Sequence, residues 1–496
     1  MRTALRLGAA ALMALVALPN AALAGPDGDP KPGYKDPGRG IGVVALIDTG
    51  INPYSKAFRD NSKNAYKHPS KYLKGYPKKA TALRLSLDLP YKKAIKKDAK
   101  VWQSVEHAKL YWIPGTRISG AISLGNGGTN CPMVPVPPAN VLSTGCDEHR
   151  ILDDHGHGTM TASRAAGAPN SLASKARIVM IEGLEAQSVR WAAEQRWIDV
   201  QSNSWISLVP PPIPSAVTDA FSYAADRMLT LAGSGNGTAY ILGGAPTPTY
   251  LLSTAPPGVV LVGGHDNGKM TLWSGSPPHV VADAYAGFAA PSTSTGGMRP
   301  HPMACCTSAA SPYAAGGGVA IVQQARALLH DRSAGIQGKL VACGDPGKIN
   351  NGPLKDGAFT LGELKDVFFH TAEAHPSKGR DDGKIHWAGD PRPPDETQYG
   401  PGGNPFCQGC TTTPLAWKEI PEAGDATYSF VGYGGINEFS VEHAGKVLAG
   451  HKAMPERAGA DAQYNLDQEI RQAEFSGSSD GTEKGTSMSC PQTAKG

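Results

Sequence analysis

Two residues that stand far apart in the chain, Asp48 and His157, have the types and surroundings of a catalytic acid–base pair. Asp48 directly follows the apolar run 43–47, and His157 precedes a run of small residues at 159–166. A buried carboxylate that hydrogen-bonds to an imidazole holds the ring in one tautomer and stabilises its protonated form. An imidazole held in this way can take the proton of a serine hydroxyl. The pair therefore predicts a nucleophilic serine further along the chain.

Two downstream serines compete for this role. Ser308 opens the small-residue and apolar stretch 309–329, which predicts a long buried helix with its positive dipole end beside the serine. Ser487 is followed by only nine residues with a polar end, which is too few for a stable buried helix. Position and context favour Ser308, and Ser487 is the alternative nucleophile.

The chain between these residues alternates between strand-like and helix-like runs. The expected strands are 41–47, 176–181, 198–202, 229–232 and 259–263, and the expected helices are 159–166, 187–196, 216–228, 309–329, 361–373 and 441–448. This alternation predicts an α/β fold with a parallel sheet. Sites in such folds lie beyond the carboxyl ends of the strands, and both Asp48 and Asn236 follow expected strands.

Four short motifs resemble those of the subtilisin-like serine peptidases, the subtilases, and they occur in the family order. They are Asp-Thr-Gly-Ile at 48–51, His-Gly-Thr at 157–159, Asn236 in a glycine-rich loop, and Thr-Ser-Ala-Ala-Ser-Pro at 307–312. The resemblance covers most of the chain after residue 24. It implies a subtilisin-like parallel sheet flanked by helices on both faces, here with a long insertion between the Asp and His motifs.

The resemblance also implies a role for each residue. Ser308 attacks the peptide carbonyl, His157 moves the proton, and Asp48 orients His157. Asn236 donates a hydrogen bond to the developing oxyanion. The implied activity is hydrolysis of polypeptide substrates through an acyl-enzyme intermediate. This chemistry needs no cofactor, no metal site is assigned, and structural calcium is implied by the resemblance alone, without ligands that can be placed.

The choice of serine is sharpened by the family pattern. The motif around Ser487, at 485–491, matches the family more closely, because Cys306 stands where the family has glycine before the Ser308 motif. The spacing from Asn236 is 72 residues to Ser308, which is typical of the family, and 251 to Ser487. A nucleophile at Ser487 would make about 264–480 an insertion, so Ser308 remains the favoured choice.

The expected substrate-binding residues are Ser204, Trp205 and Gly233. Ser-Trp-Ile at 204–206 stands where the family has Ser-Leu-Gly, so we expect a reshaped pocket whose specificity cannot be carried over. This departure and the Cys306 that replaces a family glycine keep open a second hypothesis. In it the protein is not an enzyme but a catalytically silent binding protein with the subtilase fold.

The N-terminus has the pattern of a secretory signal peptide at 1–24, with two arginines, a short apolar run and a small-residue cleavage site. No other membrane segment is expected, so the protein is predicted to be secreted. We expect a flexible leader at 25–40, a peptidase domain at 41–456 with an insertion at about 57–150, and a polar, disordered tail at 457–496. Eight cysteines in an exported chain favour disulfide bonds, with Cys131 and Cys146 as one expected pair.

Charge is concentrated in the segment 56–100, which holds twelve Lys and two Arg against three Asp, a net charge of +11 in a chain of +4. Such a segment can attract an anionic surface or an acidic substrate. The plainer interpretation, which we favour from sequence, is that the segment is an insertion whose lysines face the solvent and keep the protein soluble. No nucleic-acid-binding motif accompanies the lysines.

Overall fold

The computed structural model describes a large part of the chain, with gaps. The described residues are 34–37, 40–125, 151–153, 156–168, 171–205, 215–234, 258–266, 269–270, 279–283, 289–292, 297–300, 307–331, 340–373, 386–387 and 434–455. The expected signal peptide, most of the leader, Asn236, Ser487, the tail and seven of the eight cysteines lie outside these ranges.

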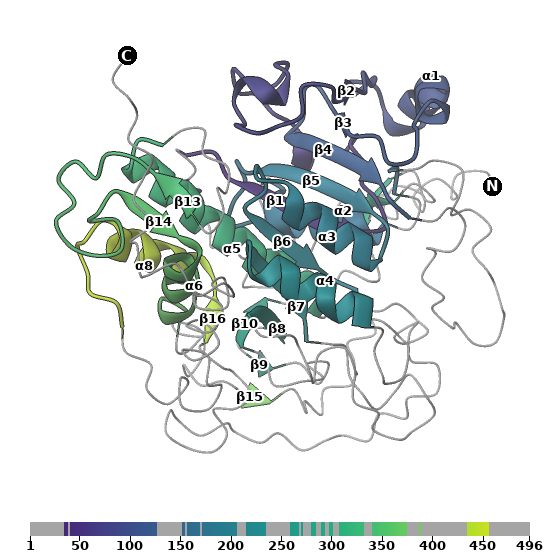
Figure 1. Cartoon of the computed structure of the whole chain (residues 1–496). Helices are drawn as coiled ribbons and strands as arrows, with labels where there is room; N and C mark the ends of the chain where they lie inside the picture. The colour runs from purple at the N-terminus through teal and green to yellow at the C-terminus, as the bar shows by residue number, and fades with distance from the viewer. Residues whose placement is uncertain are drawn as a thin grey trace, which may run out of the picture.

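A parallel sheet forms the centre of the molecule (Figure 1). Its six central strands lie side by side in the order β8 (Val259–Asp266), β7 (Leu229–Gly233), β6 (Val200–Asn203), β1 (Val43–Asp48), β5 (Arg177–Glu182) and β4 (Ile118–Ser123). Each neighbouring pair is parallel. The carboxyl ends of all six therefore lie along one edge of the sheet.

Shorter strands extend the sheet at both ends. Next to β4 lie β3 (Tyr111–Trp112), which is antiparallel to it, and then β2 (Thr81–Ala82). On the side of β8 lie β10 (Val280–Asp283), β16 (Gly435–Ile436), β9 (Lys269–Met270) and β15 (His386–Trp387). Two separate antiparallel pairs join β11 (Ala289–Ser292) with β12 (Gly297–Pro300), and β13 (Leu340–Cys343) with β14 (Ala358–Thr360).

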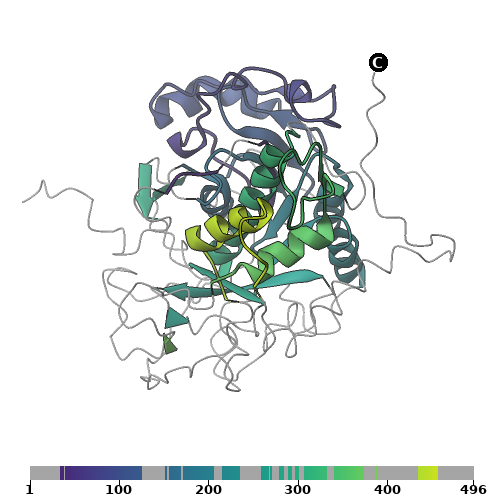
Figure 2. The same cartoon turned by 90° about the vertical axis from the view of Figure 1, so that its left-hand side faces the viewer.

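Helices cover both faces of the sheet (Figure 2). One face is covered by α2 (His157–Ala166) and α5 (Thr307–Leu328), with α6 (Leu361–His370) and α8 (Glu438–Leu448) packed beside α5; the other is covered by α3 (Ala186–Glu194) and α4 (Ser215–Ala225). Because side chains alternate along a strand, Val44 and Leu46 of β1 pack toward α5, and Val43 and Ile47 pack toward α3 and α4. Asp48 continues this alternation on the α2 and α5 side.

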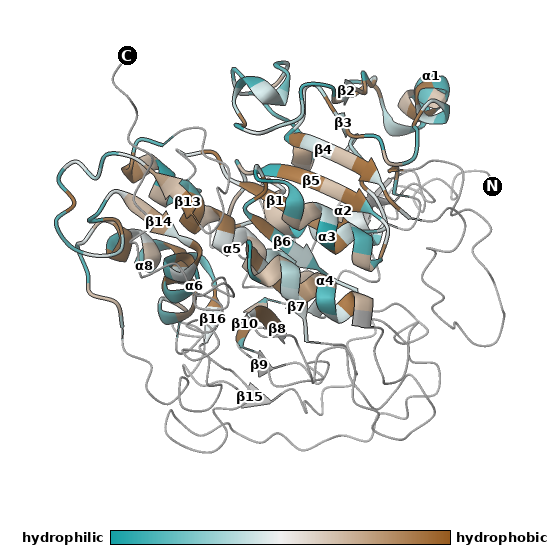
Figure 3. Ribbon diagram, viewed as in Figure 1, coloured by the Kyte–Doolittle hydropathy of each residue, from teal (hydrophilic) through white to brown (hydrophobic). Residues whose placement is uncertain are grey.

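The apolar residues of the central strands are buried under these helices, and Figure 3 shows hydrophobic colouring on strands such as β5 and β8. The α2 and α5 helices approach each other closely: a Cβ atom on Gly316 would lie 2.6 Å from the carbonyl oxygen of Ala165. A glycine at this position allows the two helix backbones to pack directly against each other. Within the described ranges, no helix combines the length and the apolar character needed to cross a membrane.

The strands and helices expected from the sequence are confirmed within a few residues. The strand expected at 41–47 runs from Val43 to Asp48, so the aspartate is its last residue. The helix expected at 159–166 begins two residues earlier, at His157, and the helix expected at 441–448 begins at Glu438, where Asn437 caps it. The fold class predicted from the alternation is therefore correct.

The segment expected as an insertion contains more structure than its sequence pattern predicted. Up to residue 125 it forms two short 3-10 helices, η2 (Lys56–Phe58) and η3 (Pro69–Lys71), then β2, α1 (Tyr91–Gln103), β3 and β4. The last of these, β4, lies in the central sheet beside β5. This part of the segment therefore extends the sheet and its hydrophobic core.

Candidate active site

Asp48 and His157 meet at the carboxyl edge of the sheet. His157 is the first residue of α2, and its Nδ1 atom lies 2.7 Å from Oδ1 of Asp48 at the end of β1. The Asp48 side chain is 2% exposed and that of His157 is 15% exposed. The carboxylate is thus shielded from water, and the imidazole still reaches the surface.

Both oxygens of Asp48 are held by further hydrogen bonds. The backbone N–H of Thr49 donates to Oδ1 at 2.8 Å, and the hydroxyl of Thr161 lies 3.0 Å from Oδ2. Thr161 is one helical turn after His157, so the same helix supplies both side chains that face the carboxylate. These contacts fix the orientation of the Asp48 carboxylate.

A second buried carboxylate, Asp153, joins the two motifs, and the sequence analysis missed it. Its Oδ1 accepts hydrogen bonds from the Thr49 hydroxyl at 2.9 Å and from the Gly156 N–H at 2.7 Å, and its Oδ2 accepts one from the Thr159 N–H at 2.7 Å. Gly156 is the N-cap of α2 and has no side chain, so Asp153 takes over the capping of the helix. The signal in the sequence was an acidic residue four positions before His157.

Glycines allow the two motifs to approach each other closely. A Cβ atom on Gly158 would lie 2.2 Å from the carbonyl oxygen of Gly50, and the Gly158 N–H donates to the Thr49 hydroxyl at 2.9 Å. Gly50 and Gly156 have φ angles of +122° and +92°, which L side chains rarely adopt. The Gly residues in the Asp-Thr-Gly and His-Gly-Thr motifs are therefore needed for the contact between β1 and α2.

The surroundings of His157 raise its pKa. Burial of the ring lowers the pKa, but the charge of Asp48, the hydrogen bond to it and the charge of Asp153 act in the opposite direction and outweigh burial. The net result is a pKa above the usual 6.5. Asp48 therefore stabilises the protonated imidazole, which is the form that a general base becomes after it takes a proton.

Ser308 is the second residue of α5, and it lies at the same end of the molecule as His157. The α2 and α5 helices run in parallel, because His157 contacts the end of β1 and Ser308 contacts the end of the neighbouring parallel strand β6. The two helices pack against each other where Ala165 meets Gly316. His157 and Ser308 each stand roughly two helical turns before that contact. The parallel packing thus brings the N-termini of the two helices to the same edge of the sheet.

The Ser308 side chain is partly exposed and contacts the end of β6. Its hydroxyl donates to the carbonyl oxygen of Ser204 at 3.1 Å, and the Ser204 hydroxyl donates to the carbonyl oxygen of Ser308 at 3.0 Å. This reciprocal pair attaches the start of α5 to the residue that directly follows β6.

The other expected substrate-binding residues surround this contact. Gly233 ends β7, and a Cβ atom there would lie 3.0 Å from Oγ1 of Thr307, the residue before Ser308. Trp205 packs on Phe221 of α4, with the ring centres 5.8 Å apart. The structure therefore brings Ser204, Trp205 and Gly233 to the carboxyl ends of β6 and β7, beside the start of α5.

Among the described residues, no group of three or more His, Cys, Asp or Glu side chains could hold a metal ion.

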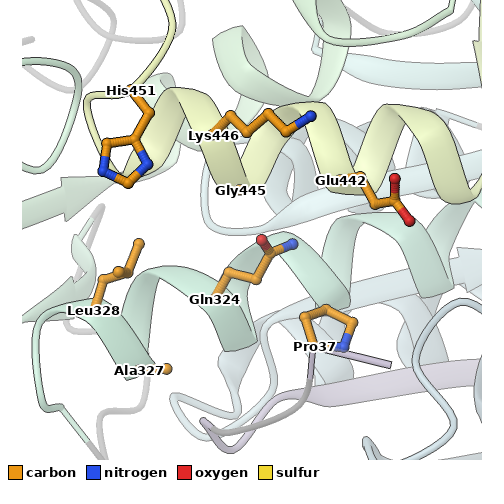
Figure 4. A pocket seen from close by; sticks show the side chains of 8 residues that line it. All are labelled: Pro37, Gln324, Ala327, Leu328, Glu442, Gly445, Lys446 and His451. Atoms are coloured by element: carbon orange, nitrogen blue, oxygen red, sulfur yellow. The ribbon is translucent and has the colours of Figure 1, made fainter. Parts of the chain in front are cut away.

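A cavity of about 340 Å³ lies between α5 and α8, lined by Gln324, Leu328, Glu442, Lys446 and His451 among others (Figure 4). Gln324 stands 16 residues after Ser308, which places the cavity roughly 24 Å along α5 from the candidate site. The cavity contains none of the predicted site residues.

Among solved structures, the chain is similar to the epidermin leader peptide processing serine protease of Staphylococcus aureus. The match to that protein has 13% identity and a TM-score of 0.39, and covers 86% of this chain and 79% of that chain. The match to its serine-to-alanine mutant has 12% identity and a TM-score of 0.37, and covers 81% and 75%. No curated protein sequence matches the chain.

The family comparison covers the described site. The model of the subtilase family matches residues 38–383, a range that includes Asp48, His157 and Ser308. With these residues at one edge of a parallel sheet, and with the family match spanning most of the chain, the chain belongs to the subtilase family and is a subtilisin-like serine peptidase.

Proposed function

We propose that this protein is a secreted endopeptidase in which Asp48, His157 and Ser308 form the catalytic triad. The observation that carries this proposal is the 2.7 Å hydrogen bond between His157 and a buried Asp48, at the edge of the sheet where Ser308 lies in the first turn of α5. A carboxylate that holds an imidazole beside a serine at a helix N-terminus is suited to nucleophilic acyl transfer.

The reaction follows from the positions of the groups. Ser308 rotates about its Cα–Cβ bond away from the Ser204 carbonyl, and its Oγ attacks the carbonyl carbon of the scissile peptide bond while His157 Nε2 takes the hydroxyl proton. The C–N bond breaks as His157 returns this proton to the leaving amine, which leaves an ester on Ser308. Water then gives a proton to His157 and attacks the ester, and the acid product leaves with Ser308 restored.

The negative charge on the substrate oxygen needs donors at the same edge. We assign Asn236 to this role, because it stands three residues after Gly233, and Gly233 packs directly against Thr307 at the start of α5. The N-terminus of α5 favours a negative charge in addition. Ser204, Trp205 and Gly233 form the surface on which the substrate chain is expected to lie.

Secretion is proposed from the N-terminal 24 residues, which have the pattern of a cleaved signal peptide. The eight cysteines of the chain favour disulfide bonds in an exported protein, and such bonds would need an oxidising compartment. Structural calcium, which many members of the family bind, is left without assigned ligands.

The test is labelling of the secreted protein with a serine-directed fluorophosphonate, followed by peptide mapping. We expect the label on Ser308, and its loss in His157→Ala. The matched control is Ser311→Ala, which removes a buried hydroxyl of the same helix that contacts Ser202 at 3.1 Å and should leave labelling intact. A label on Ser487 would refute the assignment of Ser308, and a chain that neither reacts nor hydrolyses denatured protein would be a silent binding protein.

A further inference from the structure

Five lysines gather on the outer face of α1, a helix at the edge of the molecule beyond β2 and β3 (Figure 1). They are spaced so that they share one side of the helix, and each is exposed: Lys92, Lys93, Lys96, Lys97 and Lys100. The opposite side of α1 is buried through Ala94, Asp98 and Trp102. The lysines therefore form a continuous cationic stripe on a firmly docked helix.

This stripe destabilises the helix that carries it. Lys92 and Lys96 are four residues apart, as are Lys93 and Lys97, and like charges at this spacing repel each other. Lys92 and Lys93 also stand in the first turn, where the helix dipole disfavours positive charge, and no acidic residue balances them there. Local stability does not explain the arrangement.

Three acidic side chains in this part of the molecule are engaged elsewhere, and Asp88, which precedes α1, is exposed. Asp98 accepts hydrogen bonds from the hydroxyls of Tyr54 and Ser86, Asp60 pairs with Arg177, and Glu106 pairs with Lys109. In the part of the chain that the structure describes, none of the five lysines of α1 forms an ion pair. The stripe thus presents its charge to the solvent.

The helix is attached to the segment that carries Asp48. Tyr54 accepts a hydrogen bond from Nε1 of Trp102 at 3.0 Å and donates one to Asp98 at 2.8 Å. The N–H of Tyr54 donates to the side chain of Asn52, whose own N–H donates to Thr159 of α2 at 2.9 Å. Two residues that follow Asp48, Asn52 and Tyr54, therefore hold α1 in a fixed position relative to the His157 helix.

We propose that the outer face of α1 is an exosite that binds acidic segments of polypeptide substrates and so favours their cleavage. The inference rests on the proposed function and adds a class of preferred substrate. The partner is chosen by charge complementarity and by the attachment of α1 to the active-site segment. An anionic lipid surface fits less well, because the stripe contains no large apolar side chain that could enter a bilayer; the exposed ones among the described residues are Tyr66, Leu89 and Phe439.

The test compares two forms of one unfolded polypeptide that differ only in a tract of glutamates or of glutamines away from the cleaved bond. We expect the wild-type protein to prefer the glutamate form, and added salt to reduce this preference. The variant in which all five lysines of α1 are changed to glutamine should show a KM for the glutamate form raised on the order of tenfold, with kcat unchanged. Cleavage of a short neutral peptide should be the same in both proteins.

The matched control changes the same number of exposed lysines to glutamine outside α1, at Lys63, Lys67, Lys71, Lys74 and Lys78. This variant should keep the preference for the glutamate form. If both variants lost the preference for the glutamate form to the same extent, the effect would come from net charge alone, and the proposal would be overturned. Absence of any preference in the wild-type protein would overturn it as well.

Direct binding separates this proposal from the assignment of the nucleophile. Ser308→Ala should bind a fluorescent polyglutamate peptide, measured by anisotropy, and should lose this binding when the α1 lysines are also changed. If the wild-type protein bound polyglutamate but cleaved no polypeptide substrate, the proposed function would be refuted and the exosite would stand. Loss of binding to phosphatidylglycerol vesicles in the α1 variant, with unchanged binding of polyglutamate, would refute the exosite and identify a lipid-docking face.

Discussion

The Nδ1 atom of His157 lies 2.7 Å from Oδ1 of Asp48, although the two residues are 109 positions apart. The contact joins the end of a buried strand to the start of a helix. Thr49 and Thr161 hydrogen-bond to the Asp48 carboxylate, and Asp153 hydrogen-bonds to the first turn of the helix. Because Nδ1 faces a carboxylate, the neutral ring carries its proton on Nδ1 and presents Nε2 as the basic nitrogen. The geometry thus defines which nitrogen acts as the base.

The first prediction concerns the pH dependence of activity. The pKa of His157 is raised above 6.5, and a general base works only in its neutral form. We therefore expect kcat/KM for a neutral peptide to rise with pH, with a midpoint above 6.5. The stability that the protonated ring contributes is complete below 6.5 and is lost as the pH rises through the pKa of the folded state.

Asp48→Asn tests the cause of this shift. Loss of the charge should lower the pKa of His157, which NMR titration of the ring in a Ser308→Ala background would follow, and kcat should fall on the order of 10⁴-fold. If the kcat/KM profile of the wild-type protein had its acid midpoint at or below pH 6.5, the predicted rise in the pKa of His157 would be wrong.

Asp153→Asn is expected to weaken the connection between the two motifs. The buried carboxylate accepts three hydrogen bonds, and an amide in its place turns one acceptor into a donor that faces an N–H group. We expect the free energy of unfolding to fall by about 1–3 kcal/mol, and the midpoint of the pH–activity profile to move to lower pH. Urea unfolding and kcat/KM profiles measure the two effects, with Asp88→Asn at an exposed position as the control. An unchanged profile would show that Asp153 only supports the fold.

Thr161 offers a test of how Asp48 is oriented. Its hydroxyl lies 3.0 Å from Oδ2 of a carboxylate that is 2% exposed. Thr161→Val keeps the shape of the side chain and removes the donor, so kcat should fall while KM stays the same, and stability should fall by about 1–3 kcal/mol. Thr161→Ser retains the hydroxyl and should restore most of the activity. Equal kcat values for the two variants would exclude the orienting role.

The sequence predicted the Asp48 and His157 pair because both stand next to strong local patterns, an apolar strand and a small-residue helix. It did not predict Asp153, because that role depends on three donors at positions 49, 156 and 159 that only the folded loop brings together. Tertiary contacts determined this part of the site.

The strand β4 was missed for a related reason. Its sequence, Ile-Ser-Gly-Ala-Ile-Ser at 118–123, has no clear strand pattern, and it is buried because β5 and Trp197 cover it. A Cβ atom on Gly120 would lie 3.0 Å from Val179 and 3.1 Å from Trp197, so the glycine that weakens the local pattern is what the packing requires. Local propensity and tertiary packing conflict at this strand, and the packing prevails.

The last prediction concerns Glu363, which closes the capping box at the start of α6. Its Oε2 accepts hydrogen bonds from the N–H and the hydroxyl of Thr360, at 2.8 and 3.0 Å. Burial raises the pKa of this carboxyl to about 7, although the bonds from Thr360 act against the rise and nearby Asp356 and Asp366 add to it. Between pH 4.5, the usual pKa of the group, and about pH 7, the folded state therefore binds more protons than the unfolded state. The stability that this group contributes falls as the pH rises through that range.

Glu363→Gln keeps an acceptor for Thr360 and carries no charge. It should therefore be more stable than the wild-type protein above pH 7, on the order of 1–2 kcal/mol, and equally stable in acid. Thermal unfolding at a series of pH values measures this difference, and Glu442→Gln, at an exposed position of α8, is the control that should follow the wild-type curve. If Glu363→Gln were less stable than the wild-type protein at every pH, the cap would depend on the carboxylate charge and the prediction would be wrong.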